Sequence, residues 1–265
     1  MQKRFLWLSL ATFQLLFACT QNKPSQPPTA ALAVVKMEEK TIRKCARDST
    51  VCAEVTLRYP TLSSERNVAA ISAINEALRE KALTGLEANP KMSVEQALDS
   101  VQKNLLAMLK EHLKMSPDWD ADYTKGVNTE TLLNSARFVS FEMTCSGFTG
   151  GAHPYYHASL TTYNLSSGQP VQLFDIVRDT AALRPMLEEG FVDAKKEAMP
   201  DATLADLLFP ELTQLPLPTN VCIVPDGLRF FYNPYEVAPW AVGPTEITLT
   251  WEQLRDLVER GKWVD

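Results

Sequence analysis

The stretch richest in residues that could do chemistry is 146–157, which reads SGFTGGAHPYYH. His153 and His157 lie four residues apart, the spacing at which two histidines on a helix bind one metal ion. The flanking residues are typical of strands, however, and four residues of a strand span about 13 Å, so the two rings would lie too far apart to share an ion. We therefore predict no metal site here and no cofactor.

The same stretch has the features of a rigid turn that presents side chains to a partner. Its adjacent glycines permit backbone angles that other residues rarely adopt, and the proline that follows them stiffens the exit from the turn. We predict that the turn contributes five residues to a binding surface: Gly150, Gly151, His153, Pro154 and Tyr155.

Little else in the sequence suits an enzyme mechanism. The motifs GxSxG, HExxH and GxGxxG do not occur, and we expect His112 to lie solvated on a helix. Asp118 and Asp120 could form the carboxylate pair of a glycosidase, but they stand in a polar segment where solvated acids are the simpler interpretation. We therefore predict that the protein has no catalytic residue and is not an enzyme. The alternative is a cell-wall hydrolase in which His153 takes part in catalysis.

A second unusual stretch, residues 230–247, reads FFYNPYEVAPWAVGPTEI. Tyr232, Tyr235 and Trp240 alternate there with three prolines, which predicts a rigid loop without regular strand alternation. Such a loop either packs against the edge of a core or presents anchors that lose little entropy on binding. Its predicted contact residues are Tyr235, Pro239 and Trp240.

The N-terminus has the features of a lipoprotein signal peptide. Lys3 and Arg4 precede a mostly apolar run, and Ala18 precedes Cys19. The run is shorter than the roughly 20 residues that cross a bilayer, and a small residue before a cysteine suits the lipoprotein peptidase. We predict a signal peptide over residues 1–18 and a lipid anchor on Cys19, with an ordinary secretory signal or a short membrane anchor as the alternative.

Residues 19–36 are polar and rich in proline, which predicts a semi-extended tether between the lipid and a folded domain. Thr20 stands where an aspartate would favour retention at the inner membrane. We therefore expect an outer-membrane lipoprotein that faces the periplasm, or one on the extracytoplasmic face of the membrane if the cell has a single membrane.

The charge balance argues against nucleic acid as a partner. The chain has 26 Lys and Arg against 32 Asp and Glu, a net charge of −6. Without Lys3 and Arg4, which leave with the signal peptide, the balance is 24 against 32, or −8. An acidic protein without a basic cluster binds nucleic acid poorly, and a cationic partner would suit it better.

Four cysteines remain after the predicted lipidation site, an even number that favours disulfides outside the cytoplasm. Cys45 and Cys52 flank a short hairpin-like loop, while Cys145 and Cys222 each end a run of strand-forming residues. We predict these two pairings, although the sequence leaves the other two arrangements open. A zinc site is the rival interpretation, but the spacing is not CxxC.

Hydrophobic periodicity predicts strands and helices in separate runs. Residues 51–59 alternate like a strand that ends at Pro60, and helices are predicted over 67–83 and after the capping residue Ser93. The polar residues 116–130 should join two halves. Further strands, joined by turns, are predicted over 136–145, 157–168, 169–177, 221–224, 227–232 and 246–250.

Two short helical segments complete the prediction. One covers residues 203–212, and the other follows a capping box formed by Thr250 and Gln253. Strands that pair through hairpins, with helices gathered in separate runs, predict an α+β fold with mainly antiparallel sheets, flanking helices and two closely associated parts.

The two unusual stretches and their surroundings resemble a known family. The sequence GGAHP, the segment YNLSSGQPVQLFDIV and the segment DGLRFFYNPYEVAPWAVGP together resemble the RsiV-like domain, the extracellular lysozyme-sensing part of an anti-sigma factor. Upstream, EVTLRYPTLSSERNVAAISAINEAL resembles the small domain found ahead of it in that family and in certain peptidoglycan deacetylases. The resemblance implies a small α+β domain over 37–125 and an RsiV-like α+β domain over 126–265.

The resemblance also implies a function. The family's sensor member recognises lysozyme, so we expect an envelope lipoprotein with a non-catalytic binding domain that recognises lysozyme or a cell-wall-associated ligand. Control of a sigma factor is not expected, since a lipobox stands where the sensor has a sigma-binding segment and a membrane helix. A structural envelope lipoprotein without a specific ligand is the other alternative.

Overall fold

The computed structural model describes residues 32–47 and 50–263. The predicted signal peptide, Cys19 with its lipid, and residues 20–31 of the predicted tether lie outside the described residues. The last residues of that tether, from Val34 onward, already belong to a strand. Within the described ranges, no helix is both long and apolar enough to cross a bilayer.

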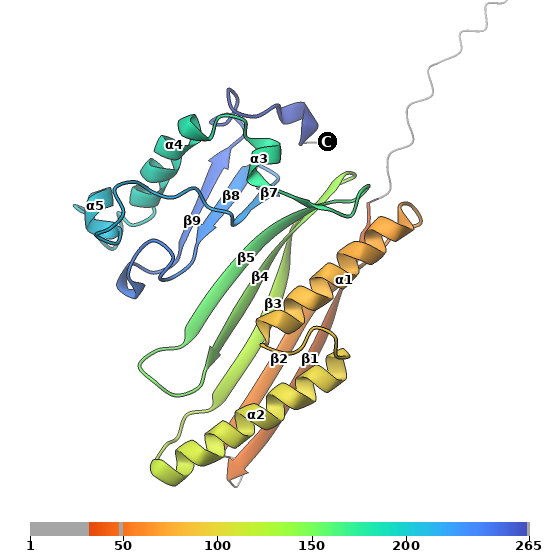
Figure 1. Ribbon diagram of the computed structural model, residues 1–265, viewed down its shortest axis with the longest axis vertical. Helices are drawn as coiled ribbons and strands as arrows, with labels where there is room; N and C mark the ends of the chain where they lie inside the picture. Colours follow the sequence, from red (N-terminus) through yellow and green to blue (C-terminus); the bar gives the residue numbers. More distant parts are fainter. Residues whose placement is uncertain (1–31, 48–49, 264–265) are drawn as a thin grey trace, which may run out of the picture. The chain divides into compact units, whose positions relative to one another are not determined.

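A six-stranded sheet runs through the first two thirds of the described chain (Figure 1). All neighbouring strands are antiparallel except the second and third, which are parallel, so the predicted α+β class with mainly antiparallel pairing is confirmed. From one edge to the other the strands are β1 (Val34–Arg47), β2 (Val51–Ser63), β3 (Tyr123–Asn134), β4 (Phe138–Phe148), β5 (Tyr155–Asn164) and β6 (Pro170–Val171).

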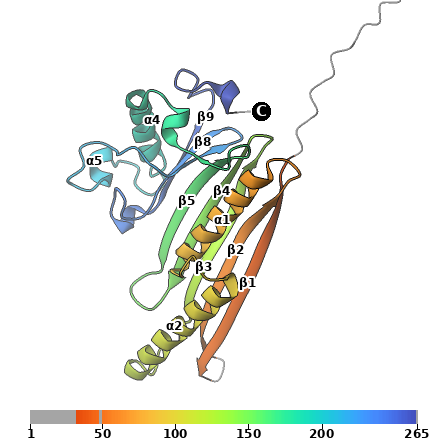
Figure 2. The same ribbon diagram turned by 45° about the vertical axis from the view of Figure 1, so that its right-hand side comes forward.

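Two helices, α1 (Val68–Gly85) and α2 (Val94–Met115), connect the parallel pair β2 and β3 and cover one face of the sheet (Figures 1 and 2). Both helices lie where periodicity predicts them. Ser93 caps α2 through a reciprocal pair of hydrogen bonds with Gln96, each 3.2 Å long. Two apolar residues of these helices lie outside the core, because Val68 at the start of α1 is 67% exposed and Met108 is 52% exposed.

The predicted link between two halves is wrong over much of its length, because Tyr123–Asn134 is the interior strand β3. Only Tyr123, Val127 and Thr129 of this strand are buried, so polar residues outnumber apolar ones and hide the alternation. The predicted domain boundary between residues 125 and 126 falls inside β3, and the sheet therefore continues across it.

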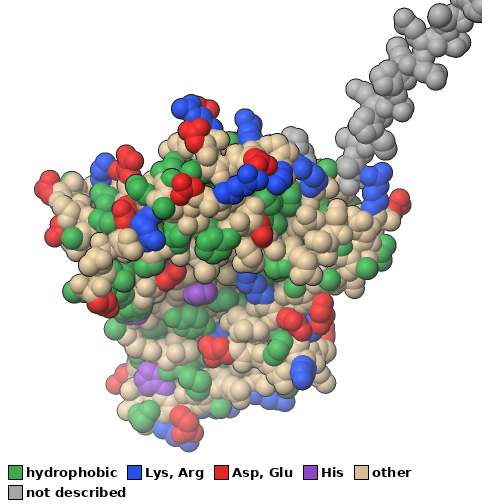
Figure 3. Space-filling model, turned by 45° about the horizontal axis from the view of Figure 1, so that its top comes forward, with side chains coloured by type: hydrophobic (Ala, Val, Ile, Leu, Met, Phe, Trp, Pro, Cys, Tyr) green, Lys and Arg blue, Asp and Glu red, His purple; other side chains and the backbone are tan. Residues whose placement is uncertain are grey.

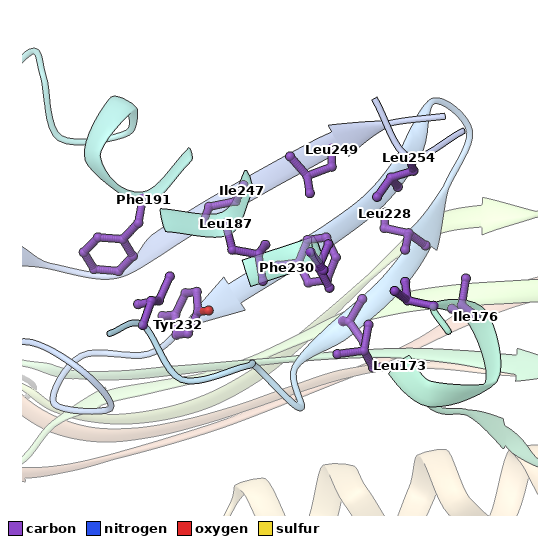
Figure 4. Close-up of a cluster of buried hydrophobic side chains, with 14 of the residues drawn as sticks. Leu173, Ile176, Leu187, Phe191, Leu228, Phe230, Tyr232, Ile247, Leu249 and Leu254 are labelled. Atoms are coloured by element: carbon purple, nitrogen blue, oxygen red, sulfur yellow. The ribbon is translucent and has the colours of Figure 1, made fainter. Parts of the chain in front are cut away.

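A three-stranded antiparallel sheet follows, in the order β7 (Val221–Val224), β8 (Gly227–Tyr232) and β9 (Thr245–Thr250). The predicted hairpin at Asp226–Gly227 is confirmed by the pairing of Val224 with Gly227. One face of this sheet packs on helices to form the cluster in Figure 4. The helices of this part are α3 (Leu173–Ile176), α4 (Thr180–Asp193) and α5 (Leu204–Leu207), with 3-10 turns η1 (Trp240–Val242) and η2 (Arg260–Lys262).

The second sheet packs on the face of the first sheet that α1 and α2 leave uncovered. Strand β4 shows the division, because Phe141 packs in the cluster with α1, whereas its neighbour Glu142 lies 3.5 Å from Arg229 of β8. The Ile223 amide of β7 also donates a 2.8 Å hydrogen bond to the Thr162 hydroxyl of β5. A small apolar cluster fills this layer and includes Ala158, Leu160, Cys222, Val224 and Phe231.

The first predicted disulfide is present and the second is wrong. Cys45 and Cys52 are bonded as directly paired residues of the β1–β2 hairpin. Cys145 and Cys222 are free thiols. Cys145 packs toward α1, where a Cβ at Gly85 would lie 2.5 Å from its sulfur, whereas Cys222 lies in the layer between the two sheets. The six-stranded sheet separates the two thiols. Each cysteine lies at the end of a run of strand-forming residues, as predicted, but this position does not bring the two together.

Strand β2 was predicted to end at Pro60, but it continues to Ser63. Its pairing with β3 reaches only from Ala53 to Arg58, while its pairing with β1 continues to the end of the strand. At Pro60 the strand therefore has a partner on one side only, an edge-like position where a missing N–H is tolerated.

Other differences lie in the C-terminal part. The predicted strand 169–177 is a two-residue strand followed by helix α3, because its apolar residues turn inward at helical spacing. Helix α4 was not predicted, since Pro185 and Gly190 interrupt its pattern. The predicted short helix over 203–212 is present as α5. Thr250 and Gln253 do form hydrogen bonds typical of a capping box, but only turns follow them.

Candidate functional site

The glycine-rich turn between β4 and β5 adopts the conformation that its sequence predicts. Gly150 and Gly151 have φ angles of 80° and 133°, a region that side chains disfavour. Gly150 also approaches its surroundings closely, because a Cβ there would lie 2.9 Å from the Tyr123 hydroxyl and 3.1 Å from the His112 ring. The turn is thus fixed against the end of α2 and the start of β3.

His112 is not solvated as predicted but helps to hold this turn. Its Nδ1 atom lies 2.6 Å from the Tyr123 hydroxyl in a hydrogen bond, and its ring lies 4.5 Å from that of Trp119. Trp119 in turn stacks on Phe148 at the end of β4. The aromatic residues of the supposed linker are therefore structural supports of the turn.

The loop that follows β8 both packs and presents side chains, so the two interpretations of this stretch apply to different residues. Val237 and Ala238 are buried in the core. Tyr235 points outward with 58% of its surface exposed, and its φ angle of 66° is unusual for a residue with a side chain. The Asn233 amide donates a 2.8 Å hydrogen bond to the Glu236 carboxylate, which fixes the bend.

The structure brings the two unusual stretches together. The ring of His153 stacks on that of Trp240, with centroids 4.0 Å apart and planes inclined by 14°. Tyr235 lies beside Trp240 at 5.9 Å. We call His153, Tyr235 and Trp240 the aromatic shelf. Histidine side chains are visible at the surface among hydrophobic ones in Figure 3.

His153 is held in place by a hydrogen bond within its own turn. Its Nδ1 atom donates to the carbonyl oxygen of Pro154 at 2.9 Å, because a carbonyl can only accept. Pro154 and Pro239, both exposed, flank the shelf on the two loops. These two prolines restrict the backbone beside His153 and Trp240.

A cavity of about 480 Å³ adjoins the shelf and includes Tyr235 in its wall. It lies along the outer edge of β5, between that strand, α1 and the loop after β8. Its polar lining is mostly uncharged, with one ammonium and one carboxylate: Lys81, His157, Ser159, Thr219, Asn220, Asn233 and Glu236. Such a lining can donate and accept hydrogen bonds to an uncharged polar ligand.

Two asparagines that the sequence analysis missed close the edge of β5. Asn233 accepts a 2.7 Å hydrogen bond from the Ala158 amide and donates a 3.0 Å bond to the Ala158 carbonyl. Asn220 donates to the same carbonyl at 2.9 Å and accepts from the Leu160 amide at 2.5 Å. The two side chains thus take the place of a neighbouring strand and fix the loop against β5.

Lys81 was also missed, because it lies outside the two stretches that the sequence singles out. Its ammonium donates a 2.6 Å hydrogen bond to the Thr161 hydroxyl of β5. Burial lowers the pKa of Lys81, and the nearby Cys145 sulfur opposes that effect. A cation without a carboxylate among its described partners therefore lies at the inner wall of the cavity.

Tyr155 does not join the shelf, although it was predicted to belong to the same surface. It begins β5 directly opposite Gly147 of β4 and lines a different cavity on the helix side of the sheet. Within the described ranges, no group of three or more His, Cys, Asp or Glu side chains could hold a metal ion.

Comparison with known proteins divides the chain into two matched regions. Residues 46–156 match a family model described as "Deacetylase PdaC", and residues 173–252 match one described as "Protein of unknown function (DUF3298)". The chain therefore combines a PdaC-like domain with a DUF3298 domain. His153 lies in the first region, and Tyr235 and Trp240 lie in the second, so the shelf is assembled from both. No curated protein matches the chain significantly.

Two solved structures are similar to this chain over most of its length. A member of the DUF3298 family from Bacteroides fragilis NCTC 9343 has a TM-score of 0.63 and 17% identity, over 87% of this chain and 95% of that one. A DUF3298 family protein from Pseudomonas aeruginosa PAO1 has a TM-score of 0.60 and 14% identity, over 89% and 99%. At these identities the likeness shows the fold alone. The narrower RsiV-like resemblance stays a prediction.

Proposed function

We propose that this chain is a non-catalytic binding protein of the bacterial envelope, which recognises a cell-wall-associated ligand through the aromatic shelf. Lysozyme is the protein ligand to test first. The observation that carries this proposal is the stacking of His153 on Trp240, because it unites two segments, each unusual in sequence, from the two matched regions.

The shelf has the properties of a preformed contact surface. Tyr235 is exposed although it is large and aromatic, and Trp240 is only partly covered. Aromatic side chains held by prolines and by hydrogen bonds lose little conformational entropy when a partner binds. The adjoining cavity offers uncharged hydrogen-bonding groups that would orient a ligand resting on the shelf.

The net negative charge of the whole chain favours a cationic protein partner, whereas the charges that line the cavity favour neither sign. The net charge is −6, yet the lining of the cavity includes one lysine and one glutamate. On the face shown in Figure 3, acidic and basic side chains are interspersed. Electrostatics would therefore speed association with lysozyme, whereas the aromatic residues would supply most of the affinity.

The envelope location is supported by the Cys45–Cys52 disulfide, since such bonds persist in oxidising compartments. The predicted signal peptide and Cys19 lipidation agree with that location. They also suggest a test, because a Cys19→Ala protein should lose metabolic labelling with a radioactive fatty acid and leave the membrane fraction.

The binding proposal is tested by calorimetric titration of the purified protein with lysozyme at two salt concentrations. We expect micromolar or tighter binding that weakens with salt and is lost in a Tyr235→Ala, Trp240→Ala double variant. Phe174→Ala is a matched control, because Phe174 is an exposed aromatic residue of α3 outside the shelf. Absence of heat with lysozyme would end the lysozyme hypothesis and leave peptidoglycan fragments as the ligand. Absence of binding to both would leave a structural role.

A further inference from the structure

A second cavity, of about 370 Å³, lies on the helix side of the six-stranded sheet. One face of α2, the turn after α1, and strands β3 and β5 form its walls. Its floor is apolar, because Leu86, Val101 and Leu105 are buried there. Met108 lies at its margin with half of its surface exposed. This lining suits the apolar part of a small molecule.

A lysine places a nearly buried positive charge in this cavity. The side chain of Lys125, on β3, is only 12% exposed, and its ammonium lies 2.7 Å from the carboxylate of Glu87. The Glu87 side chain is 73% exposed, so the negative partner stands at the rim in water. An ion pair with so exposed a member is weak, and a carboxylate that enters the cavity could replace it.

Tyr155 adds a hydrogen-bond donor to the same cavity. Its ring lies over Gly147, where a Cβ would come within 2.6 Å of the hydroxyl. The hydroxyl is buried and has no hydrogen-bond partner among the described residues. Burial, with a smaller contribution from the negative charge of Glu87, raises the pKa of Tyr155 to about 12. The group therefore stays protonated at neutral pH and close to the residue that pairs with Lys125.

We propose that this cavity binds a small monocarboxylate with an apolar body. The Lys125 ammonium neutralises the carboxylate in place of Glu87, the Tyr155 hydroxyl donates a hydrogen bond to it, and the apolar floor receives the body. Such a ligand satisfies three features together, namely the buried donor without a partner, the nearly buried cation and the apolar floor. The volume equals about twelve water-sized groups, which limits the ligand to short-chain or single-ring acids.

Calorimetry measures the titration of the purified protein with sodium hexanoate and with sodium benzoate. 1-Hexanol, which has the same chain length as hexanoate but no charge, is the control ligand. Tyr155→Phe removes one oxygen, and Lys125→Met removes the charge but keeps most of the stem. We expect each variant to weaken hexanoate binding by about tenfold. Tyr156→Phe and Lys103→Met are the matched controls, since Tyr156 packs between the sheets and Lys103 is exposed on α2.

Saturable binding of hexanoate, weakened about tenfold by each cavity variant and unchanged in both controls, supports the proposal. Circular dichroism of each variant establishes that it is folded. Lack of saturation with both acids would overturn it, and so would unchanged affinity in a folded Tyr155→Phe protein or equal affinity for 1-hexanol. The cavity and the aromatic shelf have no lining residue in common, so the Tyr235→Ala, Trp240→Ala protein should bind hexanoate normally.

Discussion

The imidazole of His153 lies nearly parallel to the indole of Trp240, with 4.0 Å between their centroids, although 86 residues separate them in sequence. Because this contact joins the turn after β4 to the loop after β8, truncation of either ring should disturb the presentation of the other. We expect Trp240→Ala to reduce ligand affinity by more than about tenfold, as truncation of an interface anchor does. Calorimetry measures the affinity.

The same variant should leave stability almost unchanged, within about 1 kcal/mol, because Trp240 is only partly buried. His153→Ala should weaken binding less, since Trp240 and Tyr235 remain. A large loss of stability in a folded Trp240→Ala protein, with affinity preserved, would show that the shelf is a packing element and would contradict the binding role.

Asn233 should contribute more to the free energy of unfolding than an exposed asparagine does. Its side chain makes two hydrogen bonds to the backbone of Ala158, and the residue is only 8% exposed. Asn233→Ala therefore leaves the buried Ala158 amide without this acceptor, while Asn220 still donates to the Ala158 carbonyl. We expect a loss of about 1–3 kcal/mol in the free energy of unfolding, measured by urea denaturation. The control is Asn104→Ala on α2, whose side chain is exposed and whose loss should change stability by less than about 0.5 kcal/mol. Equal effects of the two substitutions would contradict the structural role of Asn233.

Local patterns predicted those parts of the fold that depend on near neighbours in sequence. The helical spacing of Ile71, Ile74 and Leu78, the Ser93 cap and the Asp226–Gly227 turn each contain their own signal, and the structure has all three. The strand Tyr123–Asn134 was not predicted, because its place inside the sheet depends on the neighbouring strands and not on a pattern of apolar residues of its own. It is an interior strand whose hydrogen bonds go to β2 and β4, and few apolar residues are needed there.

The candidate site divides in the same way. The turn at Gly150 and the aromatic loop were found because glycine, proline and aromatic residues are unusual in strands. That His153 and Trp240 meet depends on how the two sheets pack, and Lys81 and Asn220 join the cavity for the same reason. No spacing in the sequence contains this information. The wrong Cys145–Cys222 pairing has the same origin, since the sequence does not tell on which face of a strand each thiol lies.

A carboxyl group between the two sheets should give the protein a distinctive dependence on pH. Burial raises the pKa of Glu142 above its ordinary value of 4.5, as does the charge of Glu246, and these effects outweigh the Arg229 guanidinium. The folded state therefore favours the protonated carboxyl. Its contribution is unfavourable above the raised pKa and disappears as the pH falls below 4.5.

Glu142→Gln should remove this contribution, so the variant should gain stability relative to the unaltered protein as pH rises from 4 to 7. The difference between their free energies of unfolding, measured in urea at several pH values, isolates this residue from other acids. The exposed Glu252→Gln is the control. A difference that shrinks with rising pH would mean that the Arg229 pair dominates and that the sign is wrong.

The two free thiols should differ from the two bonded ones in chemical accessibility. Burial raises the pKa of Cys222 to about 12, and it also raises the pKa of Cys145, so little thiolate is present at neutral pH. In the folded protein both should react slowly with iodoacetamide. After unfolding without a reductant, mass spectrometry should find both alkylated, while Cys45 and Cys52 should be alkylated only after reduction. A peptide pair that links Cys145 to Cys222 would contradict the assignment.

The final prediction separates backbone strain from steric contact at the turn that carries His153. Gly150 and Gly151 both have positive φ angles, so alanine at either position should cost about 1–2 kcal/mol of strain. Only at Gly150 would the added Cβ meet other atoms, the Tyr123 hydroxyl at 2.9 Å and the His112 ring at 3.1 Å, since nothing lies within 4 Å at Gly151. We expect Gly150→Ala to lower the unfolding free energy more than Gly151→Ala does. It should also weaken ligand binding, because a displaced turn moves His153 away from Trp240. Equal effects on stability and binding would show that the turn is not fixed by its contact with His112 and Tyr123.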